Sequence, residues 1–142
     1  MSADDNYMIA AFHFRVLFQG IAGLGDADSM FESVSGIQGL RAAAADGKAA
    51  ATQFQPVILR RAVAAHGQSP LQQWVLASLN KSSFTVLPQV VVQVLSEAHQ
   101  PVLTVSLKQV SIRSWSLGEL NAQKSELLLE EIQLDYKSIE LM

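Results

Sequence analysis

The last quarter of the chain decides the fold. It reads Ser114-Trp115-Ser116-Leu117-Gly118-Glu119-Leu120-Asn121-Ala122 and ends in Ile132-Gln133-Leu134-Asp135-Tyr136. Apolar and polar residues alternate on both sides of a polar segment around Gly118 and Asn121, and a period of two is typical of strands with one buried face. The stretch therefore predicts two strands joined by a turn. Helix is the competing interpretation for residues 127–141, and the alternation of Ile132, Leu134 and Tyr136 favours strand.

The rest of the chain also reads mainly as strands. Strand patterns cover residues 12–18, 30–40, 54–65 and 86–95, and a further one begins at Val102. The apolar phase changes across Ser35-Gly36, again before Val110, and once more before Trp115. A slip of one residue turns the apolar set to the other face, so these changes predict bulges or bends.

One helix is expected over residues 70–80. Ser69 is placed as its N-cap, Pro70 at its first position and Gln72 three residues after the cap, which is the pattern of a capping box. Asn80 ends it. The apolar face expected at helical spacing consists of Leu71, Trp74, Val75 and Leu79.

Residues 38–53 allow three interpretations of equal weight. The alanine-rich run has high helix propensity, and Asp46-Gly47 interrupts it. A helical turn, a β-hairpin arm with an Asp-Gly turn and a mobile loop all remain open. We treat this segment as a variable arm.

The composition suits one domain over residues 1–142, after a polar N-terminal lead over residues 1–9. Hydrophobic residues make up 49% of the 142 residues, and charged residues only 16%. Such a low charge predicts surface that is buried between subunits, because interface centres are depleted of charge. The formal net charge of −3 gives nucleic acid no overall attraction. Without cysteine, neither a disulfide nor a thiolate metal site can form.

No motif indicates catalysis, a cofactor or a metal. The glycines between Gly20 and Gly25 lack the helix and the Lys-Ser/Thr of a phosphate loop. Asp26 and Asp28 lack the further ligands of a calcium loop, and the three histidines are scattered along the chain. We expect no enzyme activity.

The chain carries no signal for export or membrane insertion that we can identify. Asp4-Asp5 stand where a secretory signal would be positively charged, and no apolar run is long enough to span a bilayer. We expect a soluble protein that does not insert into a membrane by itself.

The chain resembles the tail-tube protein family of contractile phage tails and bacterial contractile injection systems. The resemblance rests on the C-terminal hairpin already quoted, on the opening strand Phe12-His13-Phe14-Arg15-Val16 and on Phe31-Glu32-Ser33-Val34-Ser35-Gly36. It implies a β-sandwich or open barrel with one flanking helix. It also implies hexameric rings that stack into a tube, with the rings' sheets combining into a continuous inner barrel.

The resemblance implies a structural function. The lumen would conduct cargo or DNA, and a sheath protein and baseplate or spike hub proteins would be partners. Assembly would take place in the bacterial cytoplasm, and the subunit would become part of a virion or a contractile particle. A tube-initiator ring at the baseplate is the alternative, because the alanine-rich arm and Ala62 depart from the family pattern. A monomeric β-barrel that binds a small ligand is the alternative of another class.

We expect the strands over residues 12–18 and 127–136 to be edge strands that form the ring contacts. Glu130 interrupts the apolar series of the second strand, which predicts an exposed edge position or a partner across an interface. The predicted inter-subunit contacts are Phe12, Phe14, Val16, Arg60, Arg61, Leu128, Glu130, Ile132 and Leu134, and the predicted ring-stacking contacts are Arg41, Asp46 and Lys48.

Overall fold

A computed structural model of the chain describes residues 13–37, 40–42, 52–63, 69–80, 86–118, 120, 122–123 and 128–141. Its elements, in chain order, are β1 (Phe14–Gln19), the 3-10 helix η2 (Asp26–Ser29), β2 (Ser33–Ser35), β3 (Leu40–Ala42), β4 (Thr52–Phe54), β5 (Val57–Ala62), α1 (Pro70–Asn80), β6 (Leu87–Leu95), β7 (Pro101–Leu117), β8 (Leu129–Asp135) and β9 (Ser138–Leu141).

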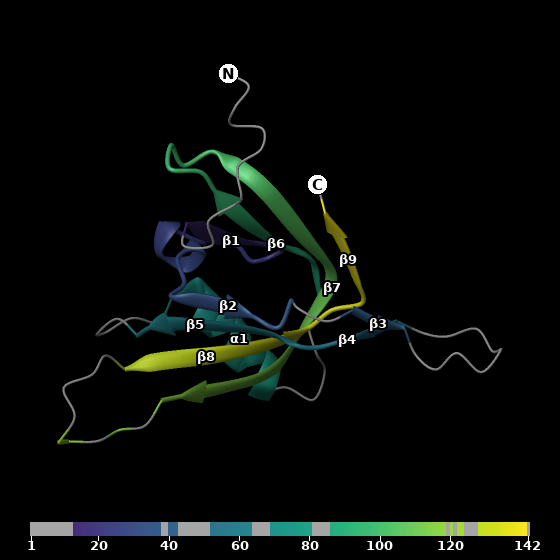
Figure 1. The fold of residues 1–142 in the computed structure, drawn as a ribbon. Helices are drawn as coiled ribbons and strands as arrows, with labels where there is room; N and C mark the ends of the chain where they lie inside the picture. The colour runs from purple at the N-terminus through teal and green to yellow at the C-terminus, as the bar shows by residue number, and fades with distance from the viewer. Residues whose placement is uncertain are drawn as a thin grey trace.

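The long strand β7 belongs to two sheets. Its first part pairs with β6 on one side and with β9 on the other, and β1 pairs with β6. Its last part pairs with β8, which is followed by β5 and β2. In Figure 1, β7 passes from the upper group of strands to the lower group. We call β1-β6-β7-β9 the first sheet and β7-β8-β5-β2 the second sheet; all their pairings are antiparallel.

Both sheets and the helix bury side chains in one core. The first sheet contributes Val16, Val90 and Leu107, the second contributes Leu59 and Ile132, and α1 contributes Leu71 and Val75. The described strands do not close into a barrel, because β1 and β2 stand at opposite ends of the strand order. The fold is the predicted one: mainly β, open, with one flanking helix.

The predicted phase changes in β7 are confirmed. Leu107 and Val110 are three positions apart, so a regular strand would place them on opposite faces, yet both are buried; Gln109 between them has a positive φ of 52°. The second change coincides with a shift of register between Ile112 and Ser114 in the pairing with β8. The first irregularity lies where β7 leaves the first sheet, and so the bend redirects the strand into the second.

The predicted helix is confirmed together with its cap. The Ser69 hydroxyl accepts a hydrogen bond from the Gln72 N–H at 3.2 Å, and the Gln72 side-chain oxygen accepts one from the Ser69 N–H at 3.3 Å. The predicted buried face is wrong at one position. Leu79 is exposed, and Ser78 is buried in its place.

The segments around the arm are shorter than the sequence predicted. Only residues 33–35 of the strand expected over 30–40 form β2, which ends before Gly36 at a φ of 96°. β3 and β4 pair as the base of a hairpin, as one of the three interpretations of the arm required. Residues 43–51 at its tip lie outside the described residues. The sequence did not predict β9 as a strand of its own.

Candidate functional site

The strand expected to form one ring seam lies inside the second sheet. β8 pairs with β7 on one side and with β5 on the other. Ile132 and Leu134 are fully buried in the subunit core, and Leu128 is half-buried. The prediction of an exposed edge here is therefore wrong, because strand neighbours occupy both sides. Alternation of apolar and polar residues indicates that one face of a strand is buried. It does not indicate whether another strand pairs with each of its two sides.

The other predicted seam strand is an edge. β1 pairs with β6 alone among the described strands. Phe14 and Arg15 are half-buried, whereas Val16 is fully buried in the core and has no exposed surface to offer a neighbour. Phe12 lies outside the described residues.

Arg60 and Arg61 are adjacent on β5 and point to opposite faces of the strand, because successive side chains of a strand alternate. Arg60 is partly exposed and forms an ion pair with Glu131 of β8 at 2.9 Å. Arg61 points inward and is 8% exposed. Both arginines therefore have carboxylate partners within their own chain.

Arg61 is the centre of a buried charge cluster. Its Nε donates to an oxygen of Glu130 at 3.0 Å, its Nη1 donates to Asp28 at 2.8 Å and its Nη2 donates to the Ser69 hydroxyl at 2.8 Å. The guanidinium carbon lies 5.4 Å from the centre of the Phe31 ring, within the range of a cation–π contact.

Glu130 is 1% exposed, so the prediction that it stands at an exposed edge is wrong. Besides Arg61, it accepts hydrogen bonds from Gln72 Nε2 at 2.8 Å and from Trp115 Nε1 at 3.0 Å. Three donors thus surround one carboxylate, and this compensates for its loss of water. The polar residue in an apolar series was the sequence signal, but its partners come from distant segments.

The cluster joins five parts of the fold. It links η2, β5, the N-cap of α1, β7 and β8 through the side chains just described. Removing one member would leave a buried charge without its partner, which is strongly destabilising. This arrangement fixes the helix and the η2 loop against the second sheet.

Of the three predicted ring-stacking residues, one lies among the described residues. Arg41 lies in β3, at the base of the arm. Asp46 and Lys48 lie outside the described residues.

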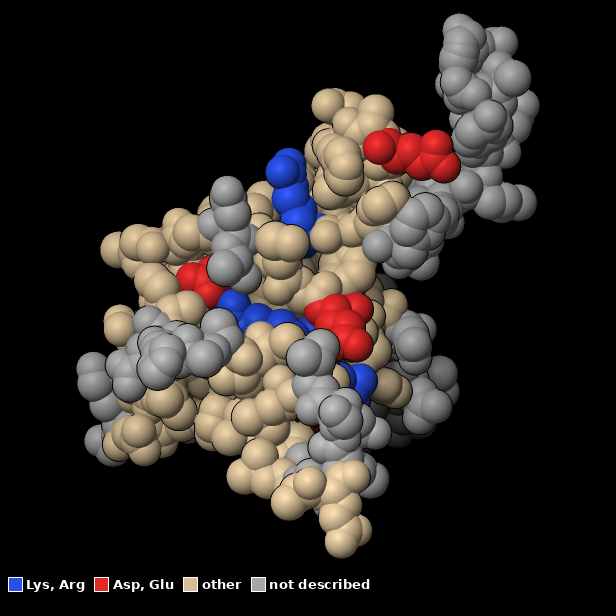
Figure 2. Space-filling model, turned by 90° about the vertical axis from the view of Figure 1, so that its left-hand side faces the viewer, with Lys and Arg blue, Asp and Glu red and all other residues tan. Residues whose placement is uncertain are grey.

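The face of the first sheet that points away from the core is polar. The registers of its four strands place on this face Arg15, Leu17, Gln19, Gln89, Val91, Gln93, Thr104, Ser106, Lys108, Ser138 and Glu140. Arg15 Nε donates to Gln93 at 2.6 Å, and Lys108 Nζ donates to Gln89 at 3.0 Å. The residues of this face are thus mainly amides and hydroxyls, with two cations and one carboxylate; Leu17 and Val91 are its apolar members, and Val91 and Ser106 are buried. Figure 2 shows another side of the molecule, where uncharged residues also cover most of the described surface.

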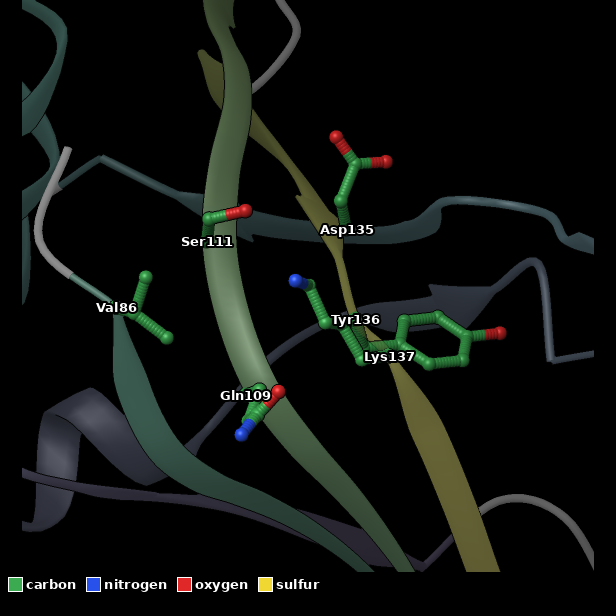
Figure 3. A pocket seen from close by; sticks show the side chains of 6 residues that line it. All are labelled: Val86, Gln109, Ser111, Asp135, Tyr136 and Lys137. Atoms are coloured by element: carbon green, nitrogen blue, oxygen red, sulfur yellow. The ribbon is translucent and has the colours of Figure 1, made fainter.

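A groove of about 390 Å³ lies beside the bend in β7. It is lined by Val86, Gln109, Ser111, Asp135, Tyr136 and Lys137. Figure 3 shows the consecutive side chains of Tyr136 and Lys137 pointing in opposite directions. Burial raises the pKa of the Tyr136 hydroxyl above its usual 10.0. The groove is open to solvent and does not enclose a ligand, which does not favour the alternative of a barrel that encloses a small apolar ligand.

The described residues lack two further kinds of feature. Among them, no three histidine, cysteine or acidic side chains are grouped closely enough to hold a metal ion. No helix among them has the length and apolar character that crossing a membrane requires.

Comparison with known proteins agrees with this geometry. A family model described as T4-like virus tail tube protein gp19 matches residues 10–140. No curated protein sequence matches the chain.

Three solved structures illustrate the fold that this chain shares with known proteins. A chain of the sheath–tube complex of an extracellular contractile injection system, PVC, in its extended state gives a TM-score of 0.77 at 18% identity, covering 100% of this chain and 97% of that one. A chain of the anti-feeding prophage baseplate, which was six-fold symmetrised, gives 0.69 at 20% identity, with 96% and 97% covered. An Hcp protein gives 0.60 at 16% identity, with 89% of each chain covered.

The family match covers nearly the whole chain, and so the chain belongs to the T4-like tail tube protein family. It is a structural subunit of a tail tube, the function that the sequence resemblance implied. The initiator and ligand-binding alternatives are not favoured.

Proposed function

We propose that six copies of this chain close into a ring through the first sheet, and that the rings stack into a tube. The observation that carries this proposal is the first sheet itself, in which β1 and β9 are open edges as far as the described strands show, and whose second face is mainly polar. Open edges normally invite uncontrolled pairing, and closing a ring edge to edge removes them. The six-fold count comes from the symmetrised relative.

The polar face of the first sheet would line the lumen. The opposite face already carries the core, the second sheet and α1, and this bulk fits only outside a closed barrel. Four strands from each of six copies, spaced ~4.8 Å apart, give a circumference of roughly 115 Å and a width of roughly 37 Å between backbones before strand tilt widens it. Such a lumen has room for cargo or DNA.

The partners and location follow from the same proposal. The related chains come from sheath–tube and baseplate assemblies, which supports a sheath protein outside the tube and baseplate or spike hub proteins at its end. The subunit would be made and assembled in the bacterial cytoplasm and become part of a virion or contractile particle. It would form part of the tube wall and would not catalyse a reaction.

Negative-stain electron microscopy, combined with mass measurement by light scattering, tests this proposal. Six-fold rings and stacked tubes are expected from the purified full-length chain. Rings that never stack would instead favour the initiator role. A strict monomer at the highest attainable concentration would contradict ring formation by this chain alone.

A further inference from the structure

The two open edges of the first sheet have compatible directions. Each pairing from β1 through β6 and β7 to β9 is antiparallel. With four strands, β1 and β9 therefore run in opposite directions. When β9 of one copy lies beside β1 of the next, the new pairing is antiparallel too, like every other pairing of the sheet.

The main-chain hydrogen-bonding groups also match. The carbonyl of His13 accepts a hydrogen bond from the Leu95 N–H at 2.8 Å. The main-chain groups of His13, and of every second residue after it in β1, therefore point toward β6. By the alternation of antiparallel strands, the main-chain groups of Phe14, Val16 and Phe18 point to the open side. The same alternation, followed through the registers of β6 and β7, points those of Ile139 and Leu141 to the open side of β9.

The side chains of these open-edge residues all lie on the core face. Val16 and Phe18 are buried there, and the registers place Ile139 beside Leu107 and Leu141 beside Val105. An odd number of strands would have put the two edges out of phase, with core-facing residues opposite lumen-facing ones. The four-stranded sheet thus continues into its neighbour without a bulge.

Two residues of β9, the exposed Leu141 and the charged Glu140, indicate the register of the pairing. Leu141 is 69% exposed although it lies on the apolar face, and Phe14 at the other edge is only half-buried. Within the described part of the chain Glu140 forms no ion pair, and Arg15 uses its Nε for Gln93 and keeps further N–H donors. One register satisfies both edges at once.

We propose that β9 of one copy pairs with β1 of the next, with Leu141 opposite Phe14 and Glu140 opposite Arg15. This inference rests on the proposed function and specifies the seam between ring subunits. Leu141 and Phe14 cover one another on the core side, and the ion pair lies on the lumen side. The Arg15–Glu140 pair falls at a non-hydrogen-bonded position, where opposite Cα atoms are ~4.5 Å apart.

That distance suits a disulfide, and the chain has no cysteine of its own to interfere. The test is the double variant Arg15→Cys, Glu140→Cys, oxidised mildly and separated on a non-reducing gel. We expect a ladder of covalent oligomers, with roughly tenfold more cross-linked chain than in either single-cysteine variant. Within one copy β6 and β7 separate the two positions by about 14 Å, so the bond must join different copies.

A second pair of cysteines tests the register. Leu17→Cys with Glu140→Cys shifts the contact by two residues and should cross-link much less. If it cross-links better than the first pair, the proposed register is wrong. If microscopy shows rings while neither pair cross-links, the seam lies elsewhere and the tube function stands. If neither rings nor cross-links form, both proposals are overturned.

Exchange of the two charges gives an independent measurement. Arg15→Glu alone and Glu140→Arg alone should each lower the yield of rings, and the double exchange should restore it. The matched control is the ion pair of Arg113 and Asp135 between β7 and β8, at 3.1 Å within one chain. Its single charge reversals should leave the ring yield unchanged, and failure of the double exchange to restore rings would contradict the pairing.

Discussion

The two sheets share β7 and one core, but they leave different groups unsatisfied. Among the described strands, β1 and β9 each have a free side at the edges of the first sheet, as β2 has in the second sheet, and the first sheet also carries a large exposed leucine at the end of β9. The second sheet instead surrounds its inward-pointing Arg61 with partners from its own chain. The buried charges of the second sheet thus fix the subunit internally, whereas the outer main-chain groups of β1 and β9 have no partner among the described strands.

The largest difference between the two sheets is expected when the same charge is placed in each of them. Ile132→Asp puts a carboxylate at a fully buried position of β8 and should cost more than about 4 kcal/mol, enough to prevent folding. Leu141→Asp, at an exposed position of β9, should leave thermal stability nearly unchanged and abolish ring formation. Circular dichroism melting and negative-stain microscopy measure the two effects. A folded Ile132→Asp monomer would contradict the assignment of β8 to the core.

Two neighbouring residues of β8 sharpen the contrast between buried and exposed charge. Glu130→Ala leaves Arg61 without one of its buried partners and should lower the free energy of unfolding by about 3 kcal/mol or more. Glu131→Ala removes the matched, partly exposed partner of Arg60 and should cost less than about 1 kcal/mol. Urea denaturation measures both. Equal losses would mean that the buried cluster contributes no more than a surface pair.

The smallest expected effect concerns Tyr136, which connects β8 to β9. Burial raises the pKa of its hydroxyl, so the unfolded chain loses this proton at a lower pH than the folded chain. Its contribution to stability is complete below about pH 10 and falls as the pH rises through the folded-state pKa. Tyr136→Phe should remove this part of the alkaline decline. Denaturation curves between about pH 8 and about pH 11 test it, and identical declines in both proteins would contradict it.

Local chemistry made several elements predictable. The capping box of Ser69 and Gln72 specified the start of α1, and the alternation in β5 and β8 specified which residues face the core. The phase changes of β7 specified its irregularities. All of these signals depend on residues near one another in the chain.

Features that depend on distant partners were not predictable in the same way. Glu130 looks alike in sequence whether it stands at an edge or inside a cluster, because its donors come from β5, α1 and β7. Alternation could not reveal that β8 has neighbours on both sides. Leu79 fits the apolar spacing of the helix, but Ser78 is the residue that is buried at this turn.

The sharing of β7 between both sheets has a mechanical consequence. A load on the first sheet reaches the second sheet through the covalent backbone of β7. Its transmission does not depend on side-chain packing between two separate sheets. β7 pairs with β6 or β8 along nearly its whole length, and with β9 as well from Val105 to Lys108, so pulling it free requires many hydrogen bonds to shear together. The shared strand therefore keeps the two sheets in register when the subunit is under load.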